Sequence, residues 1–332
     1  MAYIIKDPSY EIIAIRADID VLPITEQNNK TYKSKHEGVM HACGHDAHTA
    51  MFIGACKVLY NMRNDLKVNV KFFFQEAEER FGWAKYLIKD KCLQNTKVDY
   101  MFGLHVQANV EKGCIECKEG TLNASSNSVK IKGKRTHGAY PENGTDALVF
   151  VDQVITPLQS IISKNLSPSN MAVLTLGKIS GGEAQNVICE NVEINGTIRF
   201  LNEESKQIIM DKAKTIVENT AKAYGCKGCI YLENKGYSPV INDKELVYII
   251  KFNGEILLGK ESYKEKAYPS MGAEDFSFYT EDCKGSFFHL GCGNKKKGIN
   301  SLIHTDTFDI DEDCLFIGTA MHVLNVIYFN EK

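Results

Sequence analysis

Three histidines, one cysteine and one aspartate fall within residues 40–48. Cys43 and His45 stand just ahead of residues 47–59, where small and apolar side chains recur at helical spacing. Imidazole and thiolate groups are preferred ligands of zinc and similar ions, and the positive end of a helix favours a thiolate. The pattern predicts a metal site at a helix N-terminus that Asp46 caps. A polar turn whose histidines only cap and pack is the alternative.

Further candidate groups follow segments that read as buried strands. These segments alternate with helical patterns, which predicts an α/β fold with a mixed sheet flanked by helices. In such sheets reactive groups gather beyond the carboxyl ends of the strands. Each group alone could be a solvated strand end, but together they favour one common site. The groups are Asp18, Glu78, Glu79 and His105, after apolar runs at 11–18, 68–75 and 98–105.

The pattern changes between residues 118 and 230, where half-exposed strands and long helices alternate. This change predicts a smaller α+β domain inserted into the main one, which comprises residues 1–117 and 231–332. The insert's strands are predicted at 128–133 and 193–200, and its helices at 146–155 and 204–223.

The end of the chain returns to the main-domain pattern. Residues 286–291 read as an interior strand and residues 314–329 as a last helix. Asp309 and Glu312 stand three residues apart ahead of that helix, which predicts a capping box. His304 lies between these two elements and adds an imidazole to the candidate ligands.

The overall composition limits the classes of function. The chain has 332 residues, of which 44% are hydrophobic and 24% charged, and its net charge is −3. Such a charge gives no basic field for nucleic acid or anionic membrane. The start of the sequence lacks the pattern of a signal peptide. The odd number of cysteines, 11, favours reduced thiols over a disulfide framework. We therefore expect a soluble cytoplasmic protein.

The candidate site combines a thiolate, three imidazoles and a carboxylate. Such donors suit zinc, manganese, cobalt or nickel rather than calcium or magnesium, which prefer oxygen ligands. Five donors exceed the need of one tetrahedral ion, which favours two ions that share a bridging ligand. Glu78 is the candidate general base for a metal-bound water, and Asp18 the candidate orienting group for a ligating imidazole. The proposed ligands are Cys43, His45, Glu79, His105 and His304.

Ordered sequence blocks occur at 16–24, 40–46, 75–79, 103–106, 137–141, 186–188, 196–199, 271–276, 304 and 308–312. They include Met40-His41-Ala42-Cys43-Gly44-His45-Asp46 and Met271-Gly272-Ala273-Glu274-Asp275-Phe276. In these blocks the sequence resembles the amidohydrolases of the hippurate hydrolase type. That group is the cysteine-bearing branch of the dinuclear aminoacylase and carboxypeptidase metallopeptidases, and it includes plant indole-acetyl-amino-acid hydrolases. The resemblance runs from about Ile13 to the C-terminus.

The resemblance implies the same five ligands, with Cys43 as the bridge between two divalent ions, and the same general base. It implies that the insert acts as a lid and forms a homodimer, in which His137 polarises the scissile carbonyl of the partner's substrate. Asn186 and Arg199 would hold the substrate's carboxylate, and Gly272 would also contact the substrate. The implied reaction is hydrolysis of an N-acyl amino acid.

The sequence also departs from the family pattern. The family usually has further helices and a strand ahead of residues 16–18, almost where this chain begins, which implies either a truncated or a compact variant. Glu76 replaces a usual proline, and residues 80–83 replace a glycine-rich run, which predicts a bulkier pocket wall. Glu142 and Asp306 also differ and bear on the choice of substrate.

Several alternatives stay open. Within enzymes they are a dipeptidase and an N-acetyl-diaminopimelate deacetylase, and outside enzymes a catalytically weak dimeric binding protein. Two C-x-x-C pairs, at 114–117 and 226–229, could form a structural zinc or redox site, although chance in a cysteine-rich chain explains them better. We interpret four further histidines as structural or surface residues and His41 as a candidate neighbour of the ligands. The four are His36, His48, His289 and His322.

Overall fold

The computed structural model describes residues 1–94, 96–118, 120–121, 127–231, 237–270 and 272–330. The chain divides into two compact units, which are described separately here. The first comprises Met1–Leu122, Val240–Pro269 and Glu274–Lys332, and the second Asn123–Pro239 and Ser270–Ala273. The second unit thus begins and ends somewhat later than the predicted insert at 118–230. It also includes Gly272, which lies within the predicted main domain.

The first unit is built on a seven-stranded sheet, as predicted a mixed one. Strands β3, β2, β4 and β13 run parallel to one another, whereas β1 pairs antiparallel with β3, and β5 antiparallel with β13. In the order of the sheet the strands are β1 (Ala2–Ile4), β3 (Asn69–Gln75), β2 (Ile12–Asp18), β4 (Tyr100–Glu111), β13 (Lys284–Gly293), β5 (Ile115–Cys117) and β12 (Tyr263–Glu265). A separate two-stranded sheet joins β6 (Gly120–Thr121) and β11 (Ile241–Asn242).

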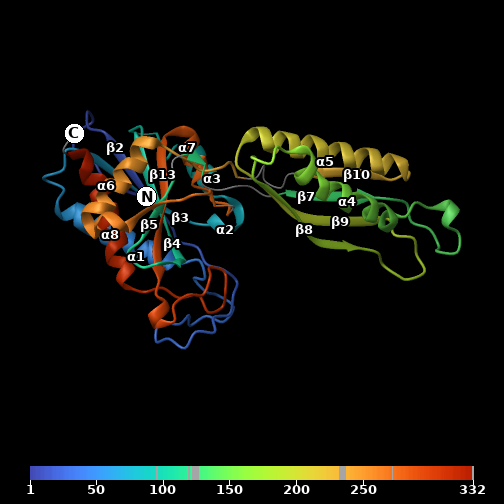
Figure 1. The fold of residues 1–332 in the computed structure, drawn as a ribbon, viewed down its shortest axis with the longest axis horizontal. Helices are drawn as coiled ribbons and strands as arrows, with labels where there is room; N and C mark the ends of the chain where they lie inside the picture. The colour runs from blue at the N-terminus through green and yellow to red at the C-terminus, as the bar shows by residue number, and fades with distance from the viewer. Residues whose placement is uncertain (95, 119, 122–126, 232–236, 271, 331–332) are drawn as a thin grey trace. The chain divides into compact units, whose positions relative to one another are not determined.

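Strand β2 lies between two layers of helices. All seven of its residues are buried, and successive side chains point to opposite faces. Ile13 and Ile15 join a core with α1, α6 and α8, whereas Ile12 and Ala14 join a second core with α3 and α7 (Figure 1). A strand buried on both faces reads as a continuous apolar run, which is why its sequence identifies it. The helices are α1 (His45–Asn61), α2 (Glu78–Phe81), α3 (Ala84–Lys89), α6 (Lys244–Leu258), α7 (Ser277–Asp282) and α8 (Asp313–Ile327), with 3-10 turns at Lys260–Ser262, Lys295–Lys297 and Tyr328–Asn330.

The N-terminus of α1 is shaped by a glycine rather than by a side-chain cap. Gly44 is the N-cap and has a left-handed backbone with φ 82°. A Cβ at this position would lie 2.4 Å from Cγ2 of Val106, so only glycine fits between the two predicted ligands Cys43 and His45. The predicted cap at Asp46 is wrong, because its Oδ1 accepts a hydrogen bond only from the neighbouring N–H of Ala47.

The predicted capping box of α8 is also wrong. Glu312 is the N-cap residue, and no side chain caps the helix there. Asp309 instead lies 2.8 Å from Nζ of Lys30 and accepts a hydrogen bond from Tyr32. The spacing suits a capping box, but none forms because Lys30 and Tyr32, which are distant in the sequence, bind the carboxylate of Asp309.

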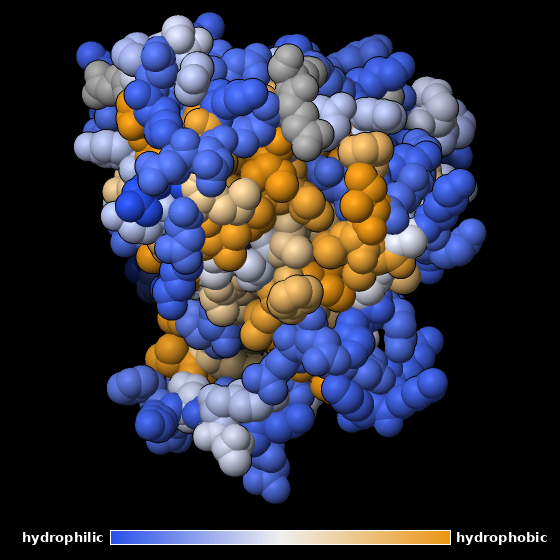
Figure 2. Space-filling model, turned by 90° about the vertical axis from the view of Figure 1, so that its left-hand side faces the viewer, coloured by the Kyte–Doolittle hydropathy of each residue, from blue (hydrophilic) through white to orange (hydrophobic). Residues whose placement is uncertain are grey.

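The outer face of the first unit carries many apolar side chains where α6 and α8 lie (Figure 2). Tyr248, Phe252 and Ile256 stand four residues apart on α6 and are 57%, 41% and 62% exposed, and Phe316 on α8 is 76% exposed. Residues at this spacing share one side of a helix. Within the described part of the chain, no helix combines the length and hydropathy needed to cross a bilayer.

The second unit packs two long helices on an antiparallel sheet. The order of the sheet is β10, β7, β9 and β8, so that β8 is an edge strand. Helix α4 continues ten residues past the predicted end at 155, because its apolar residues Leu158 and Ile161 extend the buried face. The strands are β7 (Asn127–Lys132), β8 (Ala172–Gly181), β9 (Asn191–Phe200) and β10 (Lys227–Tyr231), and the helices are α4 (Ala147–Asn165), α5 (Glu203–Ala223) and a 3-10 turn at Pro141–Asn143.

Candidate metal centre

The five predicted ligands converge in the first unit from four separate segments. Cys43 Sγ lies 3.3 Å from His105 Nε2 and 3.2 Å from His304 Nε2. His304 Nε2 also lies 3.0 Å from Glu79 Oε1. The donor atoms form two groups that could each hold an ion, Cys43–His45–His105 and Cys43–Glu79–His304. Both groups contain the sulfur of Cys43, which is the geometry that a bridging ligand requires.

The sequence pattern predicted that His105 is the last residue of its strand. This prediction is wrong, because β4 continues to Glu111. Strand β2 pairs with β4 only as far as Gly103, so that His105 lies beyond the pairing with β2 but opposite His289 of β13. The Nδ1–H of His105 donates to the carbonyl oxygen of Val106 at 2.6 Å. This bond leaves Nε2 with its lone pair directed towards Cys43, as a metal ligand needs.

His45 provides the clearest test of whether these residues fit a cation. Its Nδ1 lies 3.1 Å from Oδ1 of Asp20. Its Nε2 is buried and has no hydrogen-bond partner in the described part of the chain. A metal-ligating histidine characteristically shows this arrangement, with one nitrogen held by a carboxylate and the other left for the ion. Together with the thiol and carboxylate donors, the orphaned nitrogen makes the site suitable for divalent ions.

Burial controls the protonation of Cys43. Removal from water, together with the nearby carboxylates of Glu79 and Asp18, raises the pKa of the Cys43 thiol far above its usual range. Without a bound cation, desolvation therefore outweighs the helix N-terminus, which was expected to favour a thiolate. A thiolate at this position needs the charge of a bound cation, and its formation releases a proton.

The residue that orients His45 is Asp20, whereas the sequence pattern pointed to Asp18. Asp20 also accepts a hydrogen bond from the backbone N–H of Glu79 at 3.1 Å, and so ties two ligand segments together. Asp18 Oδ2 lies 3.8 Å from Nε2 of His45, too far for a hydrogen bond. Its Oδ1 instead lies 2.5 Å from Nδ1 of His48. The signal for Asp20 was present in the sequence, two residues after Asp18, which is the last residue of β2.

His48 has both ring nitrogens in hydrogen bonds inside the core. Its Nε2 accepts from the backbone N–H of Val106 at 2.9 Å, so its Nδ1 carries the proton that is shared with Asp18. No lone pair remains for a metal. This placement agrees with the interpretation of His48 as a structural residue.

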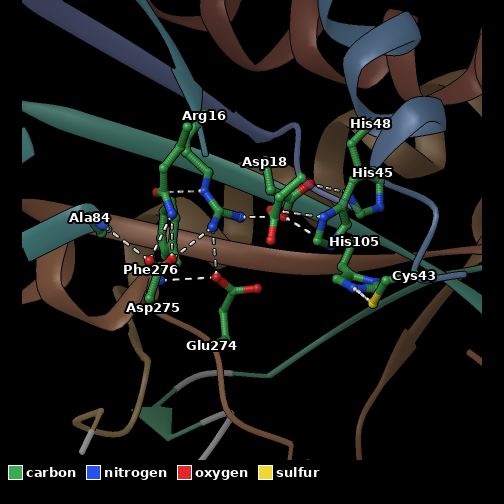
Figure 3. Close-up of polar contacts among 12 residues, drawn as sticks. Arg16, Asp18, Cys43, His45, His48, Ala84, His105, Glu274, Asp275 and Phe276 are labelled. Carbon is green, nitrogen blue, oxygen red and sulfur yellow. Dashed lines mark hydrogen bonds and ion pairs between the residues drawn. The ribbon is translucent and has the colours of Figure 1, made fainter. Parts of the chain in front are cut away.

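Arg16 is buried and gathers three carboxylates beside the ligands (Figure 3). Its guanidinium nitrogens lie 2.7 Å from Asp18, 2.8 Å from Asp275 and 3.1 Å from Glu274. Gln75 Nε2 donates to both oxygens of Asp275 at 2.8 and 2.7 Å. One cation cannot balance three buried anions, and burial raises the pKa of Glu274 to about 8. Sequence reasoning missed this cluster because its members come from distant segments.

Glu78, the candidate base, is buried beside Glu79 at the start of α2. Burial and the carboxylates of Glu274 and Asp275 raise the pKa of Glu78 well above its usual range. A raised pKa suits a group that must take up a proton and later release it. Ala77, directly before it, has a left-handed backbone with φ 54°, and so does His304 with φ 64°. Each such residue costs about 1–3 kcal/mol, a strain typical of functional sites.

The four predicted lid residues lie in the second unit. His137 and Asn186 are exposed neighbours, since the N–H of Gly138 donates to the carbonyl oxygen of Asn186 at 2.7 Å. Arg199 is half-buried on β9, and the N–H of Gly272 lies 3.3 Å from Oγ of Ser270. Met271, in the same sequence block as Gly272, lies outside the described residues. The roles of these four in binding or catalysis stay predictions.

The two C-x-x-C pairs do not form metal sites in the described structure. None of the eleven cysteines forms a disulfide in the described part of the chain. In the described part of the chain, no group of possible ligands contains Cys114, Cys117, Cys226 or Cys229.

Asp20→Asn is expected to weaken metal affinity by 10–100-fold, because the amide orients the His45 ring without the carboxylate's charge. Titration of the metal-free variant with Mn²⁺ or Zn²⁺ measures this. Asp46→Asn is the matched control, since Asp46 adjoins His45 but is exposed and contacts no ligand side chain among those described. Equal affinities in the two variants would contradict the assignment of Asp20.

Comparisons with known proteins agree with this fold and show the family of the chain. The chain belongs to peptidase family M20/M25/M40, whose sequence model matches residues 14–326. It is thus a metal-dependent hydrolase of amide bonds.

Three relatives illustrate the match. The IAA-amino acid hydrolase ILR1-like 4 of Arabidopsis thaliana is 36% identical over 93% of this chain and 71% of its own length. The N-acetyl-L-cysteine deacetylase of Bacillus subtilis is 35% identical over 91% of this chain and 71% of its own length. Among solved structures, the YXEP protein of Bacillus subtilis, a dinuclear metal-binding peptidase of the M20 family, is 31% identical with a TM-score of 0.78 and covers 97% and 82% of the two chains.

Proposed function

We propose that this chain hydrolyses the amide bond of N-acyl amino acids with two divalent ions, manganese or zinc. The observation that carries the proposal is that Cys43 is common to both groups of donors. Bound divalent ions supply a water that ionises near neutral pH. The names of the relatives, an IAA-amino acid hydrolase and an N-acetyl-L-cysteine deacetylase, support an N-acylated amino acid as substrate.

Each side chain of the site has a separate role in the proposed reaction. Glu78 takes the proton of the attacking water and delivers it to the leaving amine. Asp20 keeps the His45 ring oriented, and Arg16 holds Asp18 against His48 beside the site. In the second unit, His137 polarises the carbonyl, and Asn186 and Arg199 hold the carboxylate end of the substrate. Gly272 also contacts the substrate.

A homodimer through the second unit is part of the proposal. Strand β8 is an edge strand, and an unpaired edge is a template for another chain. Val173 and Ile179 on β8 are 42% and 47% exposed, which is consistent with a partner at this edge. The molar mass in solution, measured by light scattering, tests this part independently of activity.

Cys43→Ala is expected to lower the metal content from two ions per chain to one or none, and to abolish turnover. The reason is that both donor groups lose the sulfur. Elemental analysis, with an assay on N-acetyl- and N-benzoyl-amino acids, measures both effects. Cys56→Ala is the control, since Cys56 is a half-buried thiol on α1, the helix that begins just after Cys43. A variant that keeps two ions and full activity would refute the bridge.

The same assay separates the alternatives. Dipeptides and N-acetyl-diaminopimelate are included as substrates for the other two hydrolase activities. A parent protein that binds two ions and cleaves none of these amides would instead be a binding protein.

A further inference from the structure

The segment that carries the candidate base cannot hold its own shape. Helix α2, which contains both Glu78 and Glu79, has only four residues, and an isolated helix of this length is not stable in water. The residues that flank it, Ala77 and Gly82, both have left-handed backbones, with φ 54° and 56°. A residue other than glycine keeps such a backbone only where the surrounding structure fixes it. The position of Glu78 therefore depends on contacts outside its helix.

Asp275 fixes this segment on both sides of α2, within the first unit. Before the helix, Gln75 Nε2 donates to both carboxylate oxygens of Asp275, at 2.8 and 2.7 Å. After the helix, the backbone N–H of Ala84 donates to Oδ2 of Asp275 at 3.1 Å (Figure 3). Ala84 is the first residue of α3, so its N–H has no acceptor within that helix. One carboxylate thus anchors residues 75 and 84, with the base between them.

The contacts of Asp275 require a carboxylate at this position. Gln75 Oε1 accepts hydrogen bonds from Nε of Arg16 at 3.0 Å and from the hydroxyl of Tyr279 at 2.9 Å. These donors set the amide of Gln75 so that its NH2 group faces Asp275. Oδ1 of Asp275 also lies 2.8 Å from Nη2 of Arg16, and Oδ2 accepts from Ala84. Each oxygen therefore meets two donors, and an amide there would turn its own NH2 against a donor in either orientation.

We propose that Asp275 is a positioning residue of the hydrolysis, which sets the place of Glu78 by anchoring the chain on both sides of it. The proposal rests on the proposed function, in which Glu78 is the base. Asp275 is wholly buried, and it acts through residues 75–84 rather than on the reacting atoms. The effect on rate should be large, because a misplacement of about 1 Å at a reacting group costs about 100-fold.

Asp275→Asn is expected to lower kcat about 10–100-fold in the manganese-loaded full chain, while KM changes little because the substrate's own contacts are kept. The fold should persist, since Arg16 keeps the carboxylates of Asp18 and Glu274. Steady-state kinetics on an N-acyl amino acid measure the change. Asp282→Asn is the matched control and should keep the parent's kcat, because Asp282 is exposed at the end of α7.

Hydrogen–deuterium exchange of the metal-free protein observes the anchoring without turnover. In Asp275→Asn the Ala84 amide is expected to lose its protection, and the peptide that covers residues 76–84 should exchange faster. Glu274→Gln separates anchoring from charge. Glu274 is the other acid grouped with Glu78 and Asp275, but its Oε1 accepts from the backbone N–H of Phe276. Exchange of residues 76–84 should therefore stay at the parent's rate in Glu274→Gln.

The double variant Gln75→Glu/Asp275→Asn exchanges donor and acceptor and keeps the charge of the cluster. The new amide at 275 can donate to the new carboxylate at 75 and still accept from Ala84, so kcat and slow exchange should largely recover. This variant also replaces the single one if that does not fold. A folded double variant with the parent's exchange but without its kcat would overturn the proposal.

Two further results bear on the proposal. A slow Asp275→Asn enzyme whose residues 76–84 exchange like the parent's would show that the charge of Asp275 matters and its anchoring does not, which refutes the proposal. If the parent cleaves no N-acyl amino acid, the proposed function fails. The exchange experiment then still decides whether Asp275 anchors the segment, because it needs neither substrate nor metal.

Discussion

Glu78→Gln is expected to lower kcat by at least 100-fold while two metal ions stay bound. A positioned general base contributes about 10²–10⁴-fold to the rate, and a glutamine amide cannot accept the proton of the attacking water. The substitution keeps the size of the side chain and removes one acid from a buried cluster that already contains Glu274 and Asp275. The fold should therefore tolerate it. Steady-state kinetics and elemental analysis on the same sample measure the two effects.

Glu11→Gln is a suitable control for this experiment. Glu11 is an exposed carboxylate directly before β2 and far along the chain from every proposed ligand. The control should keep the parent's rate. A Glu78→Gln enzyme that turned over as fast as the parent would show that another group takes the proton.

Arg16→Leu is expected to lower the free energy of unfolding by about 3–5 kcal/mol, the usual effect of breaking a buried ion pair. The leucine leaves the carboxylates of Asp18 and Asp275 buried without their cation. Urea denaturation measures the change as a lower midpoint with an unchanged slope. Adding Glu274→Gln to this variant should recover part of the loss, because one of the uncompensated acids is then removed.

Arg135→Leu serves as the comparison for the loss of an arginine. Arg135 is 47% exposed, and its ion pair with Glu183 lies on the surface, where such pairs contribute about 0–1 kcal/mol. An Arg16→Leu protein as stable as Arg135→Leu would mean that the buried carboxylates are neutral without the guanidinium.

The buried strands of the first unit could be predicted because they depend on local patterns, and the five candidate ligands, which the structure brings together, could be named because each stands at a recognisable local position. Strand β2 begins with the apolar residues 12–15 and β3 contains the phenylalanines 72–74, and Cys43 and His45 flank Gly44 at the start of α1. What it missed depends on contacts between distant segments. Asp18 ends β2 and Asp20 follows it by two residues, and only the fold decides that Asp20 reaches His45.

Environment accounts for the remaining errors. The pKa of Cys43 follows from burial and from carboxylates that other segments bring close. The capping box of α8 does not form because Asp309 forms an ion pair with Lys30, which is distant in the sequence. The cluster around Arg16 joins residues from opposite ends of the chain. No spacing rule could have assembled it.

The uneven spread of the ligands along the chain bears on how the site matures as the polypeptide leaves the ribosome. Cys43, His45 and His105 emerge early, and with β2, β3 and β4 they can complete one group of donors. The other group waits for His304, which follows the whole second unit and strand β13. Domains fold as their residues become available. We therefore expect the nascent chain to complete the two halves of the centre one after the other.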